Sequence, residues 1–363
     1  MEKGTTGEPG VPPLRVLYFG TYERGYPRNA QVISCLRRAG VEVGERHEPV
    51  WESVHSWNAG LGTALRLARA ELRLRRRAEE PFDAILVGYP GHLDLAAARH
   101  AAGRRPVVFN PLVSLANTLV ADRGRFRPGG LAARALQAID RRAFRAADLV
   151  VADTAAHAEL FGSMGARRVE VCLVGAEERV FGPGWSRPDD LTALFVGKLI
   201  PLHGLETILA AAALAPELRF RIVGSGQLDR LLGDRPANVD HVPWVDYELL
   251  PAELHRASCA LGIFGTSAKA QRVIPNKVFQ ALACGTPVVT ADTAAARELL
   301  RDQESALLVP SGDPEALAGA LRRLAAEPAL AERLSAAGLA AYRERASEAV
   351  LGARWREIIA SLL

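Results

Sequence analysis

The sequence predicts an α/β protein built from two consecutive domains, each with a parallel sheet covered by helices on both faces. Short apolar runs rich in β-branched residues alternate with Ala-, Leu- and Arg-rich helical stretches almost throughout, which is the pattern of repeated βαβ units. This alternation restarts midway, after a turn-rich segment. The length of 363 residues exceeds one ordinary α/β core and suits two domains of about 150 to 200 residues each.

Twelve apolar runs are the expected strands, six in each half of the chain. Those of the first half cover residues 14–20, 41–47, 82–88, 106–110, 148–153 and 169–175. Those of the second half cover residues 191–197, 218–224, 238–243, 258–264, 286–291 and 305–310. Gly182, Pro183, Gly184 and Pro188 stand between the two sets and mark the expected domain boundary. Open α/β sheets bind ligands at the carboxyl ends of their strands, so two Rossmann-like domains in sequence predict a ligand in the cleft between them.

The domain ranges follow from this pattern. Residues 1–12 are rich in Gly, Pro and Thr without a helical or strand period, and we expect a disordered leader there. The N-terminal domain is expected over 13–182 and the C-terminal domain over 183–345. A last helix over 346–363, with Trp355, Ile358 and Ile359, would fit a return to the N-terminal domain, which the sequence alone does not show.

Composition limits the class of protein. Hydrophobic residues make up 49% and charged residues 24%, with no apolar run of 18 residues and no signal-peptide pattern, so a soluble cytoplasmic protein is expected. The four cysteines are far apart and lack C-x-x-C spacing, which disfavours disulfide and zinc roles. We therefore expect no metal site. The cysteines are Cys35, Cys172, Cys259 and Cys284.

A basic segment, RLARAELRLRRRAEE, carries much of the positive charge of the N-terminal half. Its arginines recur at helical spacing, which is typical of a solvated helix face or of a surface for anionic lipid head groups or an acidic acceptor. The second alternative implies peripheral contact with the inner face of an anionic membrane. Nucleic acid is disfavoured because no aromatic residues interleave with the arginines. These arginines are Arg66, Arg69, Arg73, Arg76 and Arg77.

The stretch FVGKLIPLHGLETI, residues 195–208, predicts a buried strand, a loop and a helix start. It lacks the glycine spacing of dinucleotide loops, and Thr192 stands where a Walker-type loop needs glycine. The free N–H groups of a helix start favour an anion, and Lys198 and His203 lie beside this one. The loop therefore predicts a phosphate or diphosphate site.

Lysine use points to the same domain. Only Lys3, Lys198, Lys269 and Lys277 are lysines among 45 basic residues, and the last three fall in expected loops of the C-terminal half. A compact ammonium in a chain that otherwise uses arginine suggests a contact that a planar guanidinium would not fit. The second basic loop, with Lys269, Arg272 and Lys277, precedes a helix that follows Pro275 and ends at Gly285.

Four motifs occur in this order in the C-terminal half: GKLIPLHGLETI, IVGSGQ, WVDYELLPAELHRASCALGIF and NKVFQALACGTPVV. They resemble the C-terminal domain of retaining glycosyltransferases of family 4, the glycosyl transferases of group 1. The N-terminal half resembles the family more loosely, in YFGTYERGYPRN, VGYPGH and ADLVVADTAAHAELF. The resemblance implies the GT-B fold, an α/β architecture of two Rossmann-like parallel-sheet domains facing a cleft.

The resemblance also implies ligands and site residues. A nucleotide-diphosphate sugar would be bound mainly by the C-terminal domain, the acceptor would lie against the N-terminal domain, and no further cofactor is implied. Catalytic roles would fall on Lys198, His92 and Arg272. Donor contacts would fall on Gly197, Lys198, His203, Gly204, Gly224, Gly226, Trp244, Lys269, Pro275, Asn276, Lys277 and Gln280. Acceptor-side contacts would fall on Gly20, Tyr22, Arg28, Asn29, His92, Asp122 and Arg123.

One departure from the family stands out. The usual signature has two glutamates eight positions apart, the first contacting the donor sugar and the second the ribose hydroxyls. These positions hold Arg272 and Gln280 here. Gln280 can still exchange hydrogen bonds with a ribose, whereas Arg272 cannot accept one and reverses the local charge. Either the donor sugar or its contacts differ, or the protein binds without turnover.

The leading interpretation is a retaining, metal-independent glycosyltransferase acting on a polysaccharide, lipid-linked or small-molecule acceptor. Cationic loops would stabilise the leaving nucleoside diphosphate, so that no protein nucleophile is needed. The alternatives are a sugar-nucleotide epimerase or a phosphorylase of the same architecture, and a non-catalytic nucleotide-sugar-binding partner of another transferase. The absence of an evident acid/base carboxylate cluster argues against an epimerase.

Overall fold

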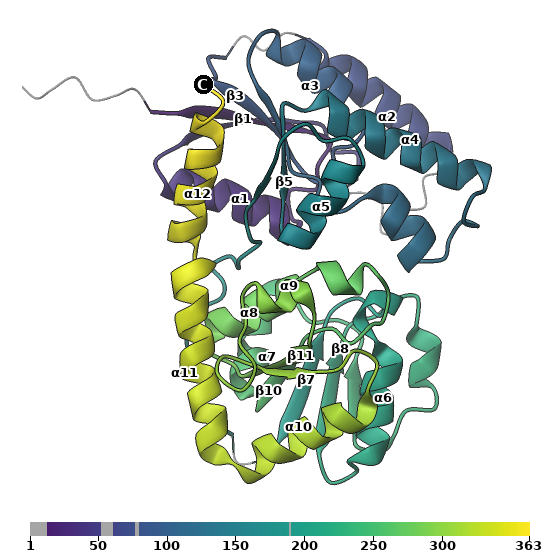
Figure 1. Ribbon diagram of the computed structural model, residues 1–363, viewed down its shortest axis with the longest axis vertical. Coiled ribbons are helices and arrows are strands. Elements are labelled where there is room, and N and C mark those ends of the chain that lie inside the picture. The colour runs from purple at the N-terminus through teal and green to yellow at the C-terminus, as the bar shows by residue number, and fades with distance from the viewer. Residues whose placement is uncertain (1–12, 52–60, 77–79, 189) are drawn as a thin grey trace, which may run out of the picture.

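The computed structural model describes residues 13–51, 61–76, 80–188 and 190–363. The expected leader at 1–12 and Arg77 of the basic segment lie outside these residues. Figure 1 shows two α/β units, one above the other, with the C-terminal helices running along one side of both.

The N-terminal unit is a parallel sheet of six strands within the described residues, in the order β2-β1-β3-β4-β5-β6. Each strand expected from the first half of the sequence is present. The strands are β1 Arg15–Gly20, β2 Glu42–His47, β3 Ala84–Val87, β4 Val107–Phe109, β5 Leu149–Ala152 and β6 Val169–Val171. The helices are α1 Pro27–Arg38, α2 Leu61–Leu74, α3 Leu95–Ala102, the π-helix η1 Asn117–Asp122, α4 Leu131–Ala146 and α5 Ala155–Ser163.

The C-terminal unit repeats this design, with the strand order β12-β11-β10-β7-β8-β9 in its described residues. The strands expected from the second half are present too, as β7 Thr192–Val196, β8 Arg219–Val223, β9 Val239–Val242, β10 Cys259–Leu261, β11 Val288–Ala291 and β12 Leu307–Val309. The α-helices are α6 Leu205–Leu214, α7 Leu250–Arg256, α8 Asn276–Cys284, α9 Ala294–Arg297, α10 Pro314–Ala326, α11 Pro328–Arg345 and α12 Glu348–Ala360. Short 3₁₀ turns are η2 Pro201–His203, η3 Asp229–Leu232, η4 Tyr247–Leu249 and η5 Ala270–Arg272.

The strand order explains where a ligand belongs. The chain changes direction across the sheet between β1 and β3 in the N-terminal unit, and between β7 and β10 in the C-terminal unit. At such a switch point the loops that leave two neighbouring strands diverge and leave a crevice between them. The loops after β7 and β10 are the two basic loops that the sequence analysis selected.

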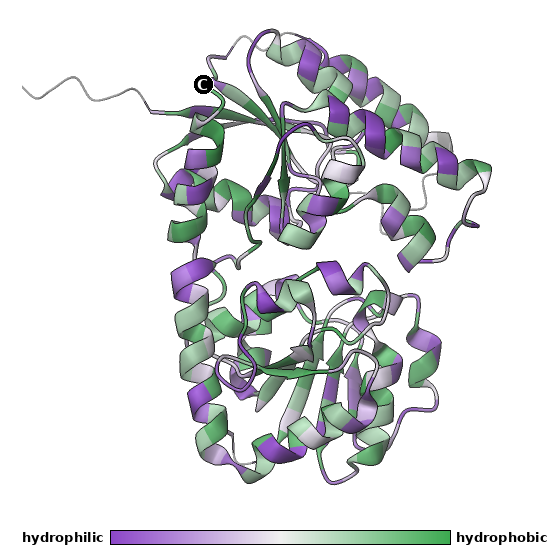
Figure 2. Cartoon of the chain, viewed as in Figure 1, coloured by the Kyte–Doolittle hydropathy of each residue, from purple (hydrophilic) through white to green (hydrophobic). Residues whose placement is uncertain are grey.

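Apolar residues fill both faces of each sheet, and Figure 2 shows the strands as largely hydrophobic while the outer helices carry hydrophilic stretches. The stripe of Leu317, Leu321 and Leu324 on α10 is buried, as its spacing predicts. All four cysteines are buried and free.

The last helix lies against the first domain. Trp355, Ile358 and Ile359 of α12 are buried in one cluster with Val32 and Leu36 of α1. Figure 1 shows α11 beside the C-terminal unit and α12 beside α1. Two chain crossings therefore join the units, the segment before β7 and the α11–α12 pair. Among the helices of the described residues, none is long and apolar enough to cross a membrane.

Candidate functional site

The loop after β7 is shaped by glycines at both ends. Gly197 ends the strand with φ 146° and Gly204 precedes α6 with φ 69°. A β-carbon on Gly204 would lie 2.6 Å from the carbonyl carbon of Phe264, so only glycine lets the two basic loops approach this closely. Between the glycines, Lys198 is exposed and residues 201–203 form a 3₁₀ turn instead of continuing as a loop. The backbone therefore turns the start of α6 toward the crevice.

Lys277 completes this loop from the neighbouring helix. It lies in the first turn of α8, one step inside a helix that begins earlier than the sequence indicates. Its ammonium is buried, has no hydrogen-bond partner in the described residues, and lies 3.7 Å from the centroid of the Phe195 ring. A β-carbon on Gly197 would lie 3.0 Å from Lys277 Nζ. Burial without a carboxylate beside it lowers the pKa of Lys277 well below its ordinary value.

His203 has a different character from the one its sequence position suggests. Its Nδ1 lies 2.5 Å from the carbonyl oxygen of Lys198, so Nδ1 carries the proton and donates it. Burial, followed by the positive charge of Lys277, lowers the pKa of His203 well below its ordinary value. The imidazole is therefore neutral at physiological pH, and Lys277 is the other basic side chain beside the loop.

Glycine is required at two positions after β8 because the backbone of the loop after β7 lies close to them. A β-carbon on Gly224 would lie 2.0 Å from the carbonyl oxygen of Gly197, and one on Gly226 would lie 2.7 Å from that of Leu199. Leu199 N–H donates to the Ser225 carbonyl at 3.0 Å. Both glycines thus let the loop after β8 pack closely on the loop after β7. Farther along, Trp244 is 74% exposed and donates from Nε1 to Asp246.

The second basic loop lies between the two units. Arg272 is half-buried, and its guanidinium has no hydrogen bond or ion pair within the described ranges, whereas its carbonyl oxygen accepts from the Thr154 hydroxyl at 2.6 Å. Pro275 and Asn276 form the start of α8. Gln280 is buried near the Tyr247 phenol, without the geometry of a hydrogen bond. The loop therefore reaches the N-terminal domain with its backbone and leaves one guanidinium unpaired.

Three of the expected acceptor-side residues have internal partners. The Tyr22 hydroxyl donates to Glu45 at 2.8 Å, and the Arg28 guanidinium donates to the Leu173 carbonyl at 2.9 Å. Asn29 exchanges hydrogen bonds with the backbone N–H and carbonyl of Tyr89, each at 2.9 Å. All three side chains are fully buried. These hydrogen bonds engage the polar groups of all three side chains within the protein.

Gly20 and His92 are also close to buried carboxylates. A β-carbon on Gly20 would lie 2.3 Å from Asp94 Oδ2, which accepts from Thr21 N–H at 2.7 Å. His92 Nδ1 lies 2.5 Å from the Pro90 carbonyl, and Nε2 lies 3.3 Å from Asp140 Oδ1 without the geometry of a hydrogen bond. Burial lowers the pKa of His92, and the Asp140 carboxylate opposes this effect.

Sequence reasoning missed Asp140. Its carboxylate accepts from Ser114 Oγ at 2.6 Å and from the N–H groups of Leu115 and Ala116, so it shapes the loop after β4. It lies on the buried stripe of α4 with Ala133 and Phe144. A lone aspartate on an otherwise apolar stripe was the available signal.

Tyr26 and Tyr89 were missed as well. Their rings lie 4.6 Å apart at the end of the loops after β1 and β3. The positive charge of Arg123 acts on both phenols. The two rings therefore form an aromatic pair that joins the loops after β1 and β3.

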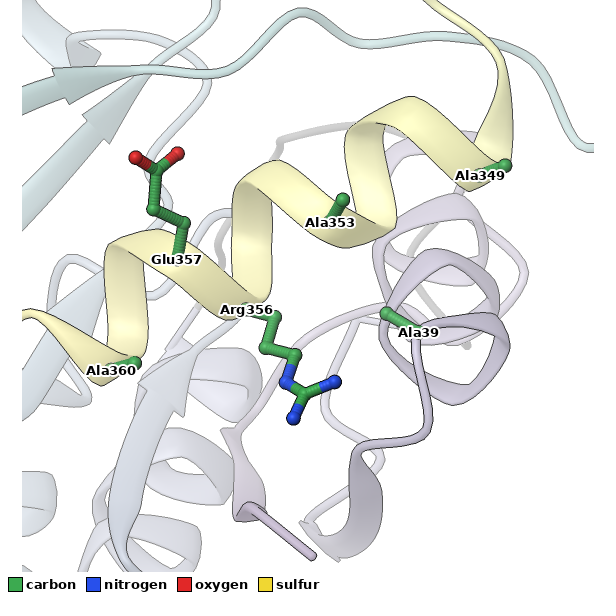
Figure 3. Close-up of a pocket in the computed structure, with 6 residues that line it drawn as sticks. All are labelled: Ala39, Ala349, Ala353, Arg356, Glu357 and Ala360. Carbon is green, nitrogen blue, oxygen red and sulfur yellow. The ribbon is translucent and has the colours of Figure 1, made fainter.

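One hollow in the described part of the structure lies away from these loops. It has a volume of about 440 Å³ and is lined by Ala39 at the end of α1 and by one face of α12 (Figure 3). It contains none of the residues that the sequence analysis selected.

Two family models match the chain. Residues 15–177 match the glycosyl transferase 4-like domain, and residues 190–327 match the glycosyl transferases group 1. The chain is 36% identical over 162 residues to a phosphatidyl-myo-inositol mannosyltransferase of Mycobacterium leprae, covering 42% of each chain. It is 32% identical over 240 residues to a D-inositol 3-phosphate glycosyltransferase of Streptomyces bingchenggensis, covering 55% of this chain and 50% of the relative. The chain spans about half the length of these curated relatives.

Solved structures resemble almost the whole chain. A sucrose-phosphate synthase from Thermosynechococcus elongatus has a TM-score of 0.74 at 18% identity, covering 96% of this chain and 99% of that one. Anabaena HepE in complex with UDP-glucose has a TM-score of 0.69 at 18% identity, covering 96% of this chain and 100% of that one. At this identity the likeness concerns the fold, and the expected GT-B architecture is confirmed.

Proposed function

Because this chain belongs to the glycosyl transferases of group 1, we propose that it transfers a sugar from a nucleotide-diphosphate sugar to an acceptor hydroxyl, with retention of configuration and without a metal ion. The observation that carries this proposal is the unpaired, buried ammonium of Lys277 beside Gly197. Burial without a partner disfavours the protonated form of Lys277, and a diphosphate at the start of α6 would favour it again.

In this mechanism the C-terminal domain stabilises the leaving group. Lys277 and Lys198 offset the charge that develops on the nucleoside diphosphate as the C1–O bond breaks through an oxocarbenium-like transition state. Neutral His203 holds the Lys198 backbone through Nδ1 and offers Nε2 to the ligand. The acceptor hydroxyl attacks on the face that the diphosphate leaves, and a diphosphate oxygen takes its proton.

The remaining donor contacts involve Arg272 and Gln280, which stand where the family usually has glutamates. Gln280 would bind the ribose through its amide, and the backbone of the β8 loop and of Trp244–Asp246 would line the base. Arg272 would contact the donor sugar or its diphosphate, which its unpaired guanidinium supports. An acidic donor sugar would suit this charge.

The acceptor would lie against the loops after β1, β3 and β4. The Tyr26 and Tyr89 rings, tilted against each other with centroids 4.6 Å apart, suit a sugar or polyol face. Two relatives are named for inositol-containing acceptors, and HepE was solved with UDP-glucose. A UDP-sugar donor and a polysaccharide, lipid-linked or small-molecule acceptor are therefore the first substrates to test.

The experiment is a calorimetric titration against a panel of nucleotide sugars, followed by assays of donor hydrolysis and of transfer with and without EDTA. We expect binding of at least one donor, slow hydrolysis, and rates that EDTA leaves unchanged. Complete loss in EDTA with recovery in Mg²⁺ or Mn²⁺ would contradict the metal-free mechanism. Binding without turnover in any acceptor extract would favour the non-catalytic partner, and 4-epimer formation would favour an epimerase.

The arginines of α2 and of the turn that follows it lead to a prediction about membranes. Arg66, Arg69 and Arg76 are exposed next to the exposed side chains of Leu65 and Leu72. Basic and apolar side chains on one outward face suit anionic lipid, and Figure 2 shows hydrophilic residues along the outer side of this helix. We expect co-sedimentation with phosphatidylglycerol vesicles that falls as salt rises, since the attraction is screened.

The matched variants are two triple substitutions with equal charge change. Arg66, Arg69 and Arg76 changed to Gln should weaken vesicle binding on the order of 100-fold, at about 1 kcal/mol per arginine. The same change at Arg333, Arg343 and Arg345 on α11 should leave it intact. Equal binding to neutral and anionic vesicles would leave α2 as an ordinary solvated face.

A further inference from the structure

The two domains meet at a cluster of buried charges beside the crevice. Lys269, in the second basic loop, donates from Nζ to Thr118 Oγ1 of the π-helix η1 at 3.1 Å. The same ammonium lies 3.7 Å from Asp122 Oδ2, with exposed fractions of 7% and 0% for the two side chains. π-Helices are rare and recur at functional sites. The Lys269 side chain thus contacts the other domain.

The Asp122 carboxylate is enclosed without hydrogen-bond donors. Neither of its oxygens receives a hydrogen bond from any described residue, and its charged neighbours are Lys269 Nζ and Arg123 Nε, the latter at 3.6 Å. A buried carboxylate that lacks hydrogen-bond donors is unfavourable by itself. The burial of Asp122 between two cations therefore calls for a compensating role. Positioning the side chains of Lys269 and Arg123 is such a role.

The backbone of Arg123 contacts the C-terminal domain, which is the proposed donor domain. Gln227, in the loop after β8, donates from Nε2 to the Arg123 carbonyl at 3.3 Å. The guanidinium is 32% exposed and makes no hydrogen bond within the described ranges. Its positive charge acts on His203 in the donor loop as well as on the phenols of Tyr26 and Tyr89. Arg123 therefore lies at the domain interface, with its backbone held by the loop after β8 and its side chain beside Asp122.

We propose that Arg123 is a catalytic residue that the acceptor domain contributes to the donor diphosphate, and that Asp122 and Lys269 are positioning residues that hold it there when the domains are closed. This inference rests on the proposed function and assigns Arg123 to the donor instead of the acceptor. A guanidinium fork suits phosphate oxygens and would disperse the charge that the leaving group gains. Because the contacts of Lys269 with Thr118 and Asp122 join the two domains, the full set of cations assembles only when both domains are engaged.

The first test separates a donor role from an acceptor role. Arg123→Ala is compared with Arg127→Ala, an exposed arginine of the same segment, using the diphosphate among UDP, GDP and ADP that the wild type binds. We expect Arg123→Ala to slow donor hydrolysis in water about 100-fold, as loss of one preorganised charge contact does, and to weaken diphosphate binding about 10-fold. Arg127→Ala should match the wild type.

Two outcomes overturn the assignment. Unchanged hydrolysis and unchanged diphosphate affinity in Arg123→Ala would do so, and so would a rise in acceptor KM alone, which would make Arg123 an acceptor contact. If the wild type binds none of the diphosphates, the proposed function itself fails, and this result is distinguishable because it appears before any variant is made.

The second test concerns the positioning pair. Asp122→Asn and Lys269→Met should each lower kcat about 10-fold with donor KM changed less than about 3-fold, and the double variant should be no worse than either, because both break one unit. Melting temperatures identify any variant that fails to fold. Additive losses of kcat would show that Asp122 and Lys269 have independent structural roles, and would contradict their joint positioning of Arg123.

A pH profile provides a readout that a merely structural role would not move. Burial, only partly offset by Asp122, lowers the pKa of Lys269 to about 8. The charged groups that face it are Asp122 and Arg123 from the η1 segment and Asp153 at the end of β5. The wild-type kcat should fall as pH rises through about 8, whereas Lys269→Arg should keep its activity to higher pH because a guanidinium does not titrate there. Identical profiles would contradict the positioning role.

Discussion

Replacing Lys277 with Met should lower kcat/KM for any nucleotide-sugar donor by about 2–4 kcal/mol of transition-state stabilisation, without lowering the melting temperature. The Lys277 amino group has no partner in the described structure, so the variant removes an unsatisfied buried polar group and keeps the packing on Phe195 with an apolar chain of similar shape. A gain or neutrality in stability combined with a loss of catalysis is the expected sign of a site built for a ligand.

Lys198→Ala is the companion variant. Lys198 is exposed, so its loss should leave stability unchanged while lowering kcat/KM by a similar 2–4 kcal/mol if it meets the diphosphate. Steady-state kinetics and thermal melts on both variants check the pair. If Lys277→Met unfolds the protein, Lys277 has a structural role, and unchanged kcat/KM in folded variants would remove the loop from the mechanism.

Arg272→Ala should lower kcat with little change in the affinity for the nucleoside diphosphate, and Gln280→Glu should change donor affinity only modestly. Arg272 has an unpaired guanidinium held at the domain interface by its own backbone, so truncation removes a charge without breaking a protein contact. Gln280 is buried, and a carboxylate there could still accept hydrogen bonds from ribose hydroxyls.

The measurement is a donor titration and single-turnover rate for each variant beside the wild type. If Arg272→Ala raises kcat, the arginine opposes catalysis, and the wild type is better described as a binder that has lost its glutamate. If Gln280→Glu abolishes diphosphate binding, the ribose does not lie at this position. Either result would redirect the assignment of the donor sugar.

The family and the fold could be predicted because their signals are local. Each strand was an apolar run between turn residues, and α8 was bounded by Pro275 and Gly285, whose φ of 77° fits the end of a helix. The order of the motifs also carried the group 1 membership that the two family models confirm. The two basic loops could be selected because a lysine is rare in this chain.

The candidate site was less predictable because burial and pairing depend on distant residues. Nothing in the sequence indicates that His203 would donate to the Lys198 carbonyl and stay neutral, or that Lys277 would reach Gly197 from α8. Tyr22, Arg28 and Asn29 follow a strand, as ligand-binding residues do, yet their partners Glu45, Leu173 and Tyr89 turn them inward. The contact of Lys269 with Thr118 and Asp122 joins residues about 150 positions apart, and a single sequence contains no signal for it.

The central claim is that the Lys277 amino group binds a diphosphate beside Gly197. Proton uptake on diphosphate binding tests this claim most directly. Titration of the preferred nucleoside diphosphate at about pH 8.5 in buffers of different ionisation enthalpy measures this uptake. The pKa of Lys277 is well below its ordinary value in the free protein and should rise beside a diphosphate, so we expect a buffer-dependent enthalpy for the diphosphate and none for the parent nucleoside. Lys277→Met should abolish the dependence. The same uptake in Lys277→Met, or diphosphate binding without any uptake in the wild type, would contradict the account.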